Sequence, residues 1–189
     1  MDKKEVLEKL KKEIEEDKSL PLFGGANLVF GEGDENSEVM FIGEAPGADE
    51  DAKGEPFVGR AGQLLNKIIE AVGMKREEVY ICNILKCRPP NNRDPLPEEM
   101  ETCTPYLQKQ IDLVKPKFII CLGRISAQWL LKTNGSLTSL RGKAHDFRGA
   151  KLNVTYHPAA LLRNPNWKRP AWDDMKMFKA MYDDMKAKG

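Results

Sequence analysis

Apolar residues recur along the chain in two patterns, one typical of amphipathic helices and one of buried strands. The helical pattern is clearest over residues 2–16, where four apolar positions share one face: Val6, Leu7, Leu10 and Ile14. Short uninterrupted apolar runs predict strands over 38–43, 79–85, 117–123 and 154–156. Further helices are expected over 60–72, from 97 to about 114, over 124–132 and from about 171.

Predicted strands and helices alternate along the sequence. This order is typical of an α/β protein in which parallel strands are covered by helices on both faces. A length of 189 residues suits one domain. We therefore expect a single domain over 1–189, in which 1–27 form an N-terminal helix and a connecting loop.

Unusual residues follow the predicted strands directly. Glu44 comes after the first strand, Asn83 lies near the end of the second, and His157 follows the fourth. In open α/β sheets, ligands bind at the carboxyl ends of the strands. The pattern predicts one cleft that gathers these three residues together with Phe57.

The loop GEAPGADEDAKGEPFVGRAG, residues 43–62, is rich in glycine and contains one Pro-Phe pair. Its glycines permit close approach of the backbone to a ligand, but it does not match the phosphate-binding pattern G-x-x-x-x-G-K-[ST]. On the residues alone, Phe57 is either a core side chain or an exposed ring for stacking.

Two polar residues in apolar surroundings have two interpretations each. Asn83 interrupts the apolar run VYICNIL, and its amide either bonds local backbone or reads a base edge that presents a carbonyl beside an N–H. His157 is either structural or catalytic. With only two histidines in the chain, a histidine-rich metal site is excluded.

Charge is distributed unevenly, although the net charge is only +1. Residues 1–56 carry 7 basic and 16 acidic side chains, whereas 141–169 carry 7 basic side chains against the single Asp146. Such basic segments either bind phosphates or solvate exposed loops.

Several classes of protein are disfavoured by the sequence. There is no apolar stretch of the roughly 18 residues that span a bilayer, and the charged N-terminus lacks the apolar core of a secretion signal. Neither a G-x-S-x-G motif nor a clear Cys–His pair indicates a hydrolase nucleophile. We expect a cytoplasmic, monomeric protein without structural disulfides or membrane contact.

Three separated stretches together resemble family 4 uracil-DNA glycosylases. They are 43–62, VYICNILKCRPPNNRDPLPEE over 79–99, and YHPAALLR over 156–163. They occur in the family's order, and the resemblance covers about residues 28–187. It implies a three-layer α/β/α sandwich with a central four-stranded parallel sheet, and it implies hydrolysis of the N-glycosidic bond of deoxyuridine in DNA.

The resemblance also implies a role for each matched residue. Glu44 and Glu50 fall on two acidic positions, the first implicated in handling the attacking water, and His157 on the histidine near the uracil O2. These three are the expected catalytic residues. The expected uracil-binding residues are Phe57, which would stack on the ring, Asn83, which would read its edge, and Gly43. Ala159 stands where the family's motif usually has Ser.

DNA containing uracil, single- or double-stranded, is the expected partner. A base inside a duplex is inaccessible, so the nucleotide must be flipped out, and a side chain from the 161–163 segment would fill the gap. The expected DNA-binding residues are Arg60, Lys86, Arg88, Leu161, Leu162 and Arg163.

The chain departs from the family at its metal site. Family members hold a 4Fe-4S cluster with four cysteines, two of them in a C-x-x-C run before a proline. Cys87 and Cys103 match two positions, but in DKSLPL the other two hold Asp17 and Leu20. Two thiolates do not complete the site. We expect no intact cluster and a mobile 87–103 loop; the alternative is a partial site for another metal.

Two other functions remain compatible with the sequence. The missing cluster ligands and Ala159 would suit a DNA-binding homologue that has lost catalysis, although Glu44, Asn83 and His157 are retained. A glycosylase for another damaged base, such as hypoxanthine, would use the same scaffold. A generic nucleotide-binding α/β protein is a third, more distant interpretation.

Overall fold

A computed structural model describes residues 1–20, 22 and 24–189. Its centre is a six-stranded sheet with the order β1-β3-β2-β4-β6-β5. The strands are β1 (Glu32–Gly33), β2 (Val39–Gly43), β3 (Tyr80–Asn83), β4 (Phe118–Leu122), β5 (His145–Phe147) and β6 (Ala150–Thr155).

The four central strands, β3, β2, β4 and β6, are parallel, as expected. The prediction of a four-stranded sheet is nevertheless incomplete, because the sheet has one more antiparallel strand at each edge, β1 and β5. Both edge strands are short and at most partly buried. They therefore lack the apolar run by which the central strands are recognised.

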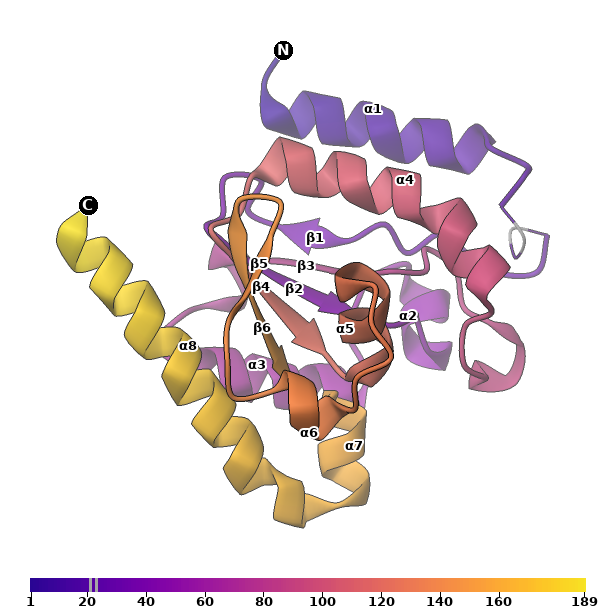
Figure 1. Cartoon of the computed structure of the whole chain (residues 1–189). Coiled ribbons are helices and arrows are strands. Elements are labelled where there is room, and N and C mark those ends of the chain that lie inside the picture. Colours follow the sequence, from indigo (N-terminus) through magenta and orange to yellow (C-terminus); the bar gives the residue numbers. More distant parts are fainter. Residues whose placement is uncertain (21, 23) are drawn as a thin grey trace.

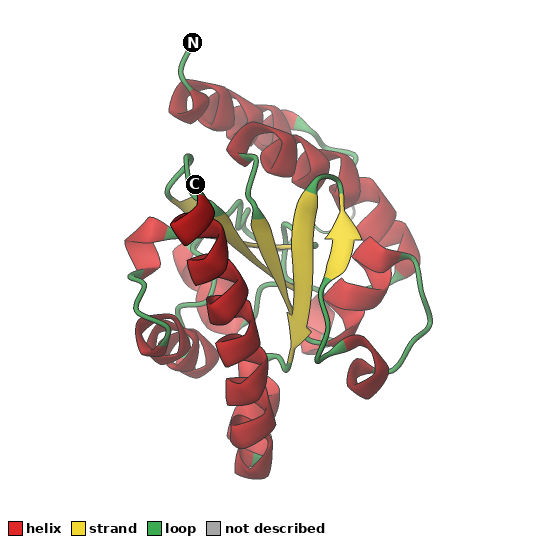
Figure 2. Ribbon diagram, turned by 60° about the vertical axis from the view of Figure 1, so that its left-hand side comes forward, coloured by secondary structure: helices red, strands yellow, loops and turns green. Residues whose placement is uncertain are grey.

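Helices cover both faces of the sheet, which confirms the three-layer α/β/α prediction (Figures 1 and 2). One face carries α1 (Lys3–Glu16), α4 (Pro97–Val114) and α5 (Arg124–Leu131), and the other carries α3 (Arg60–Ala71) and α8 (Lys168–Lys188). Shorter helices are α2 (Ala48–Lys53), α6 (Leu137–Leu140) and α7 (Pro158–Arg163), with 3-10 turns η1 (Arg76–Glu78), η2 (Pro90–Asn92) and η3 (Pro165–Trp167). Across the described residues, we find no helix with the length and apolarity that a membrane span requires.

Alternation along the strands divides the core in two. In β2, Met40 and Ile42 face the cluster under α1, α4 and α5, whereas Val39 and Phe41 face the cluster under α3 and α8. All of β2 is buried, as a central parallel strand must be when helices cover both faces.

Most predicted elements occur with small shifts at their ends. The last helix begins at Lys168 rather than near residue 171, and β6 runs over 150–155 rather than 154–156. The short helices α2, α6 and α7 were not predicted, because four to six residues are too few to show a helical period.

The N-terminal helix is attached to α4. Asp2 caps α1 in a reciprocal pair with Glu5, a geometry that satisfies otherwise free backbone donors. Leu7, Leu10 and Ile14 on α1 belong to the same buried cluster as Leu107 of α4. The apolar face predicted for residues 2–16 is therefore the face that packs on the domain.

Removing part of that contact tests the packing. Leu107 is fully buried, and we expect Leu107→Ala to lower the free energy of unfolding by about 2–5 kcal/mol through lost burial and a residual cavity. Urea denaturation measures the change. Gln108→Ala, at the exposed neighbour on the same helix, is the control, with an expected change within about 0.5 kcal/mol. Equal effects of the two substitutions would contradict this packing.

Candidate active site

The carboxyl ends of the parallel strands bring the predicted site residues to one edge of the sheet. Parallel pairing sets Gly43, at the end of β2, beside Asn83, at the end of β3. His157 follows β6 and begins α7. A β-carbon added at Gly123, after β4, would lie 3.2 Å from the His157 Cβ. The ends of four strands therefore converge, and three of them, β2, β3 and β6, carry the residues that the sequence predicted.

Gly43 is the point at which the site is most tightly packed. A β-carbon there would lie 2.5 Å from the Asn83 Oδ1 and 2.6 Å from the Phe57 Cζ. Any other residue would push the amide and the ring apart. The absence of a side chain at Gly43 is thus what allows Asn83 and Phe57 to meet.

Asn83 presents an unsatisfied acceptor. Its side chain is only 2% exposed, and its Oδ1 has no hydrogen-bond partner. An unpaired buried polar atom costs about 1–3 kcal/mol. Of the two interpretations of this residue, bonding of the Oδ1 to local backbone does not occur, which leaves a buried acceptor without a partner.

His157 lies against Phe57. The two rings stack with centroids 5.4 Å apart and an interplanar angle of 29°. The backbone N–H of Ala159 donates to the His157 Nδ1 over 3.0 Å, so in the neutral ring the proton resides on Nε2. Burial, reinforced by the charge of Arg163, lowers the pKa of His157 to about 4. At neutral pH this side chain is an uncharged N–H donor.

Glu44 directly follows β2 and is half-buried. Desolvation, followed by the charge of Asp94, raises its pKa to about 7, against a smaller opposing effect of Arg124 and Arg163. A carboxyl group with such a pKa can exchange a proton near neutral pH.

Glu50 is bonded to the backbone of the 43–62 loop through both of its carboxylate oxygens. Its Oε1 accepts from the Gly47 N–H at 3.1 Å, and its Oε2 accepts from the Val58 and Gly59 N–H groups at 3.2 and 3.0 Å. Both carboxylate oxygens are therefore committed to backbone amides. Glu50 therefore holds the two ends of the loop together, and its expected catalytic role stays a prediction.

Two expected DNA-binding residues are buried. Lys86 is 0% exposed, and its Nζ donates to the carbonyls of Asn83 at 2.8 Å and Phe30 at 3.3 Å, so it cannot contact a phosphate. Leu161 is 1% exposed and is not free to enter a base stack. Both expectations were wrong because each side chain points into the core rather than to solvent.

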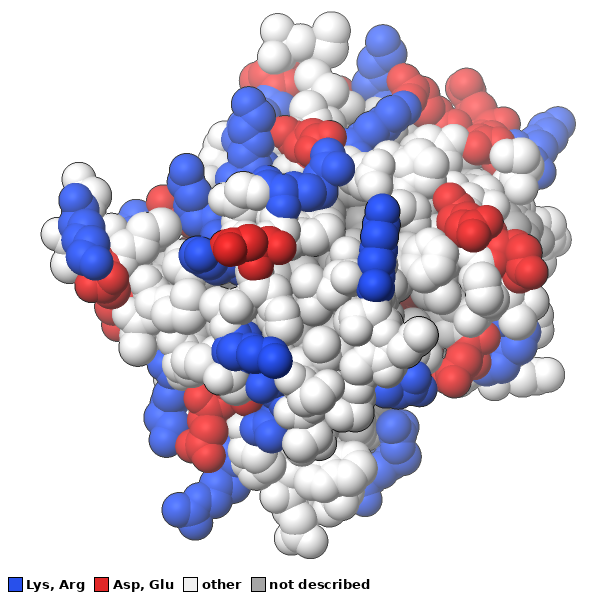
Figure 3. All heavy atoms as spheres, in the orientation of Figure 1, with Lys and Arg blue, Asp and Glu red and all other residues white. Residues whose placement is uncertain are grey.

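The other expected DNA-binding residues reach the surface. Arg60 and Arg163 are exposed, and Arg88 and Leu162 are partly exposed. On the face drawn in Figure 3, basic side chains are interspersed with acidic ones and do not form one continuous patch.

The positions that match the family's cluster ligands lie around an apolar pocket. Leu20, Leu85, Cys87 and Cys103 line it together, and burial raises the pKa of Cys87 to about 12. Asp17 instead accepts hydrogen bonds from Ser19 and Tyr106. Pro21, the proline of the expected motif, lies outside the described residues. Among the residues described, no group of three or more His, Cys, Asp or Glu side chains could hold a metal ion.

Of the 87–103 segment, for which mobility was expected, residues 97–103 belong to α4, and the loop before them is bonded to the start of that helix. Arg93 and Glu99 form two parallel contacts of 2.6 and 3.1 Å. Glu99 also accepts from the Leu96 N–H at 2.9 Å. A bidentate guanidinium–carboxylate pair gives a fixed geometry, so these contacts hold Arg93 and Leu96 against the first turn of α4.

Several residues around the site had not been identified from the sequence. Asp94, between η2 and α4, and Arg124, on α5, shift the pKa of Glu44 through their charges. Arg76 donates hydrogen bonds to the loop that carries Phe57. No motif surrounds these residues, and only the fold brings them to the site.

The fold and the position of the site place the chain among α/β/α proteins that bind ligands at the carboxyl ends of parallel strands. The sequence profile of the Uracil DNA glycosylase superfamily matches residues 30–185. The chain belongs to this superfamily.

Within this superfamily, the chain is similar to several Type-4 uracil-DNA glycosylases. The chain is 47% identical over 158 residues to the Type-4 uracil-DNA glycosylase of Archaeoglobus fulgidus, covering 79% of each chain. It is 44% identical to that of Sulfurisphaera tokodaii over 93% of this chain and 84% of the relative. Identity to the Thermotoga maritima enzyme is 41% over 86% of both. These matches confirm the resemblance recognised from the three sequence stretches.

The raised pKa of Glu44 makes stability depend on pH. Its pKa is about 7 in the fold against an ordinary value of 4.5, so between these values the folded state binds the proton more tightly than the unfolded chain. This carboxyl group therefore makes the free energy of unfolding fall as pH rises through that interval. We expect the decline to be smaller in Glu44→Gln, measured by urea unfolding at about pH 5 and about pH 8.

Glu98→Gln, at an exposed position of α4, serves as the control for this comparison. It should leave the pH dependence of the wild type in place. If Glu44→Gln and Glu98→Gln retain the same slope between the two pH values, Glu44 does not have the environment described.

Proposed function

We propose that this protein hydrolyses the N-glycosidic bond of deoxyuridine in DNA, releasing uracil and leaving an abasic site. The observation that carries the proposal is the buried, unpaired Oδ1 of Asn83 beside the ring of Phe57. Similarity to Type-4 uracil-DNA glycosylases over most of the chain supports it.

The proposed ligand is a nucleotide flipped out of the DNA. Stacking on Phe57 offsets part of the cost of unstacking the base. The centroids of Phe57 and His157 are 5.4 Å apart, which leaves no space for a base between the rings. The uracil would therefore lie on Phe57 beside the imidazole, edge-on to it.

Asn83 would recognise the hydrogen-bonding edge of the uracil base. Its Oδ1 would accept from the uracil N3–H, and its amide N–H would donate to the uracil O4, which uses both kinds of group on this side chain. Cytosine presents an acceptor and a donor at the equivalent positions, so the same amide would oppose it. Gly43 contributes by its lack of a side chain, which lets the Asn83 amide and the Phe57 ring lie close enough to hold one base.

Breaking the bond leaves negative charge on the uracil. The N1–C1′ electron pair stays on the base, and the charge spreads to O2. A neutral His157, with its proton on Nε2, would donate a hydrogen bond to O2 and stabilise this anion as it forms. The bond between the Ala159 N–H and the Nδ1 orients the ring for that donation.

Glu44 would act on the sugar side. Its carboxylate would orient a water whose oxygen bonds to C1′, and would accept the proton that this water loses. The same negative charge favours the positive character of the sugar in the transition state. A pKa of about 7 leaves a useful fraction of the carboxylate ionised near neutral pH.

The DNA backbone would be bound by the surface residues near this edge. Arg60, Arg88 and Arg163 would contact phosphates, and Leu162 or Arg163 would enter the gap left by the flipped base. We propose that one unit over 1–189, with α1 packed on α4, acts as a monomer on single- or double-stranded DNA.

We further propose that the protein works without the family's 4Fe-4S cluster. The donor set does not fit the group: Leu20 has no ligating atom, and Asp17 already bonds Ser19 and Tyr106. Cys87 and Cys103 provide only two thiolates, where four are required. No step of the proposed reaction depends on iron.

Asn83 provides the direct test of the function. We expect the wild-type protein to convert a single uracil in a labelled oligonucleotide into an alkali-sensitive abasic site. Asn83→Ala should lower kcat/KM by about 10²- to 10⁴-fold, because two hydrogen bonds to the base are lost. Strand scission after alkali, followed over time, measures the rate.

The matched control is Asn153→Ala, at another strand asparagine that is 2% exposed and has an unpaired Oδ1. It should alter stability with little change in kcat/KM. DNA binding without scission by the wild type would support an inert homologue instead, and scission only at hypoxanthine would support a different base preference.

Restoring two thiols tests the absence of the cluster. We expect Asp17→Cys combined with Leu20→Cys to acquire iron and acid-labile sulfide on anaerobic reconstitution, together with the visible absorbance of a cluster, because four thiolates are then available. The control is the double Ser variant at the same positions, which changes size and polarity without supplying thiolates. Stoichiometric iron and sulfide in the wild-type protein would contradict the proposal.

A further inference from the structure

The backbone at Phe57 is held in an unfavourable conformation. Its φ is +50°, in the left-handed region that bulky side chains rarely adopt. Residues held in this way cost of the order of 1–3 kcal/mol and persist only where their surroundings fix them. Something must therefore hold the Pro56–Gly59 segment in place.

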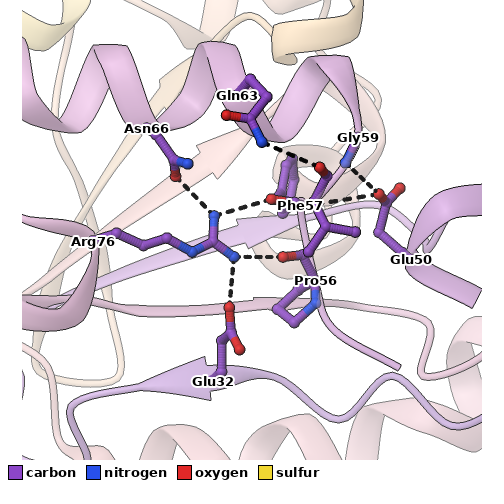
Figure 4. A network of polar contacts seen from close by, with 9 residues as sticks. Glu32, Glu50, Pro56, Phe57, Gly59, Gln63, Asn66 and Arg76 are labelled. Carbon is purple, nitrogen blue, oxygen red and sulfur yellow. Dashed lines mark hydrogen bonds and ion pairs between the residues drawn. The ribbon is translucent and has the colours of Figure 1, made fainter. Parts of the chain in front are cut away.

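Arg76 is bonded to this segment from η1 (Figure 4). Its Nη1 donates to the Phe57 carbonyl at 3.0 Å, and its Nη2 donates to the Pro56 carbonyl at 2.5 Å. The carbonyls of residues 56 and 57 define the two peptide planes on either side of the Phe57 Cα. Fixing both planes fixes φ and ψ of Phe57 and, through them, the direction of its ring.

The guanidinium is itself oriented by two further side chains. Asn66 of α3 accepts from the Nη1 at 2.9 Å, and Glu32 of β1 accepts from the Nη2 at 2.7 Å. The Arg76 side chain is 22% exposed, so these contacts are partly shielded from water. A planar fork with several donors suits this arrangement, whereas an ammonium is a single point charge.

Glu50 holds the same segment from the opposite side. The peptide between Phe57 and Val58 donates its N–H to Glu50 and offers its carbonyl to Arg76. The next N–H, of Gly59, also donates to Glu50. Figure 4 shows the loop lying between these two charged groups.

We propose that Arg76 is a positioning residue, which holds Phe57 in its left-handed conformation so that the ring is ready to stack on the target base. The inference rests on the proposed function, because it assumes that Phe57 receives uracil. Arg76 acts through Phe57 rather than on the substrate, with Asn66 and Glu32 orienting its guanidinium.

A double-mutant cycle separates positioning from general stability. Arg76→Lys keeps the charge, but an ammonium cannot bond both carbonyls in the same way. We expect this substitution to lower kcat/KM for uracil excision and to raise the inhibition constant of free uracil. Each change should be about 5- to 100-fold, which corresponds to the cost of the strained Phe57 backbone. In a Phe57→Ala background the same substitution should change kcat/KM by no more than about twofold.

Leu107→Ala is the control for reduced stability, since Leu107 lies in the core cluster under α1, α4 and α5, whereas Phe57 lies in the cluster under α3 and α8. Below its melting temperature it should leave inhibition by free uracil unchanged. Equal losses on Arg76→Lys with and without Phe57, or unchanged inhibition by uracil in Arg76→Lys, would overturn the positioning role.

Hydrogen exchange tests the inference independently of activity. In Arg76→Lys we expect the amides of Val58 and Gly59 to exchange at least about tenfold faster, because the segment is released on one side, while amides of α4 keep their rates. Unchanged exchange at both amides would overturn the inference. Faster exchange in a protein that leaves uracil in DNA would instead refute only the proposed function.

Discussion

The parallel pairing of β2 with β3 is the constraint on which the site depends. It sets Gly43 beside Asn83, and a β-carbon at Gly43 would lie 2.5 Å from the amide and 2.6 Å from the Phe57 ring. A slip of one residue would turn Asn83 to the other face of the sheet. The register is maintained by two apolar clusters, one on each face, so the geometry of the site is a consequence of core packing.

The sequence allowed the central part of this architecture to be predicted, because four buried strands produce apolar runs that are easily recognised. It did not reveal β1 and β5, whose residues are at most partly buried. Edge strands of two or three residues are defined by pairing with a neighbour, and pairing leaves no periodic signal. The ends of α8 and β6 were misplaced for a related reason, since turns adjust element boundaries locally.

The site was predictable where a polar residue interrupts or follows an apolar run, as at Glu44, Asn83 and His157. It was not predictable where a charged side chain bonds backbone. Lys86 follows a strand and suggested a phosphate contact, yet it is buried against the carbonyls of Asn83 and Phe30. Glu50 and Arg76 likewise bond peptide groups. Backbone carbonyls and amides are present at every residue, so the sequence carries no mark of which ones will be bound.

The region around Leu20, Cys87 and Cys103 illustrates how apolar packing and an ion pair together can position a loop. A cluster would tie four side chains at fixed distances, whereas Leu20, Cys87 and Cys103 line one small apolar pocket. Such a contact has no directional requirement, and the direction is supplied nearby by the pair of Arg93 with Glu99. Cys87 follows Asn83 by four residues, and Lys86 between them donates to the Asn83 carbonyl, which ties this segment to the end of β3. The surroundings of the amide are therefore fixed by ordinary hydrophobic and polar contacts of the described residues.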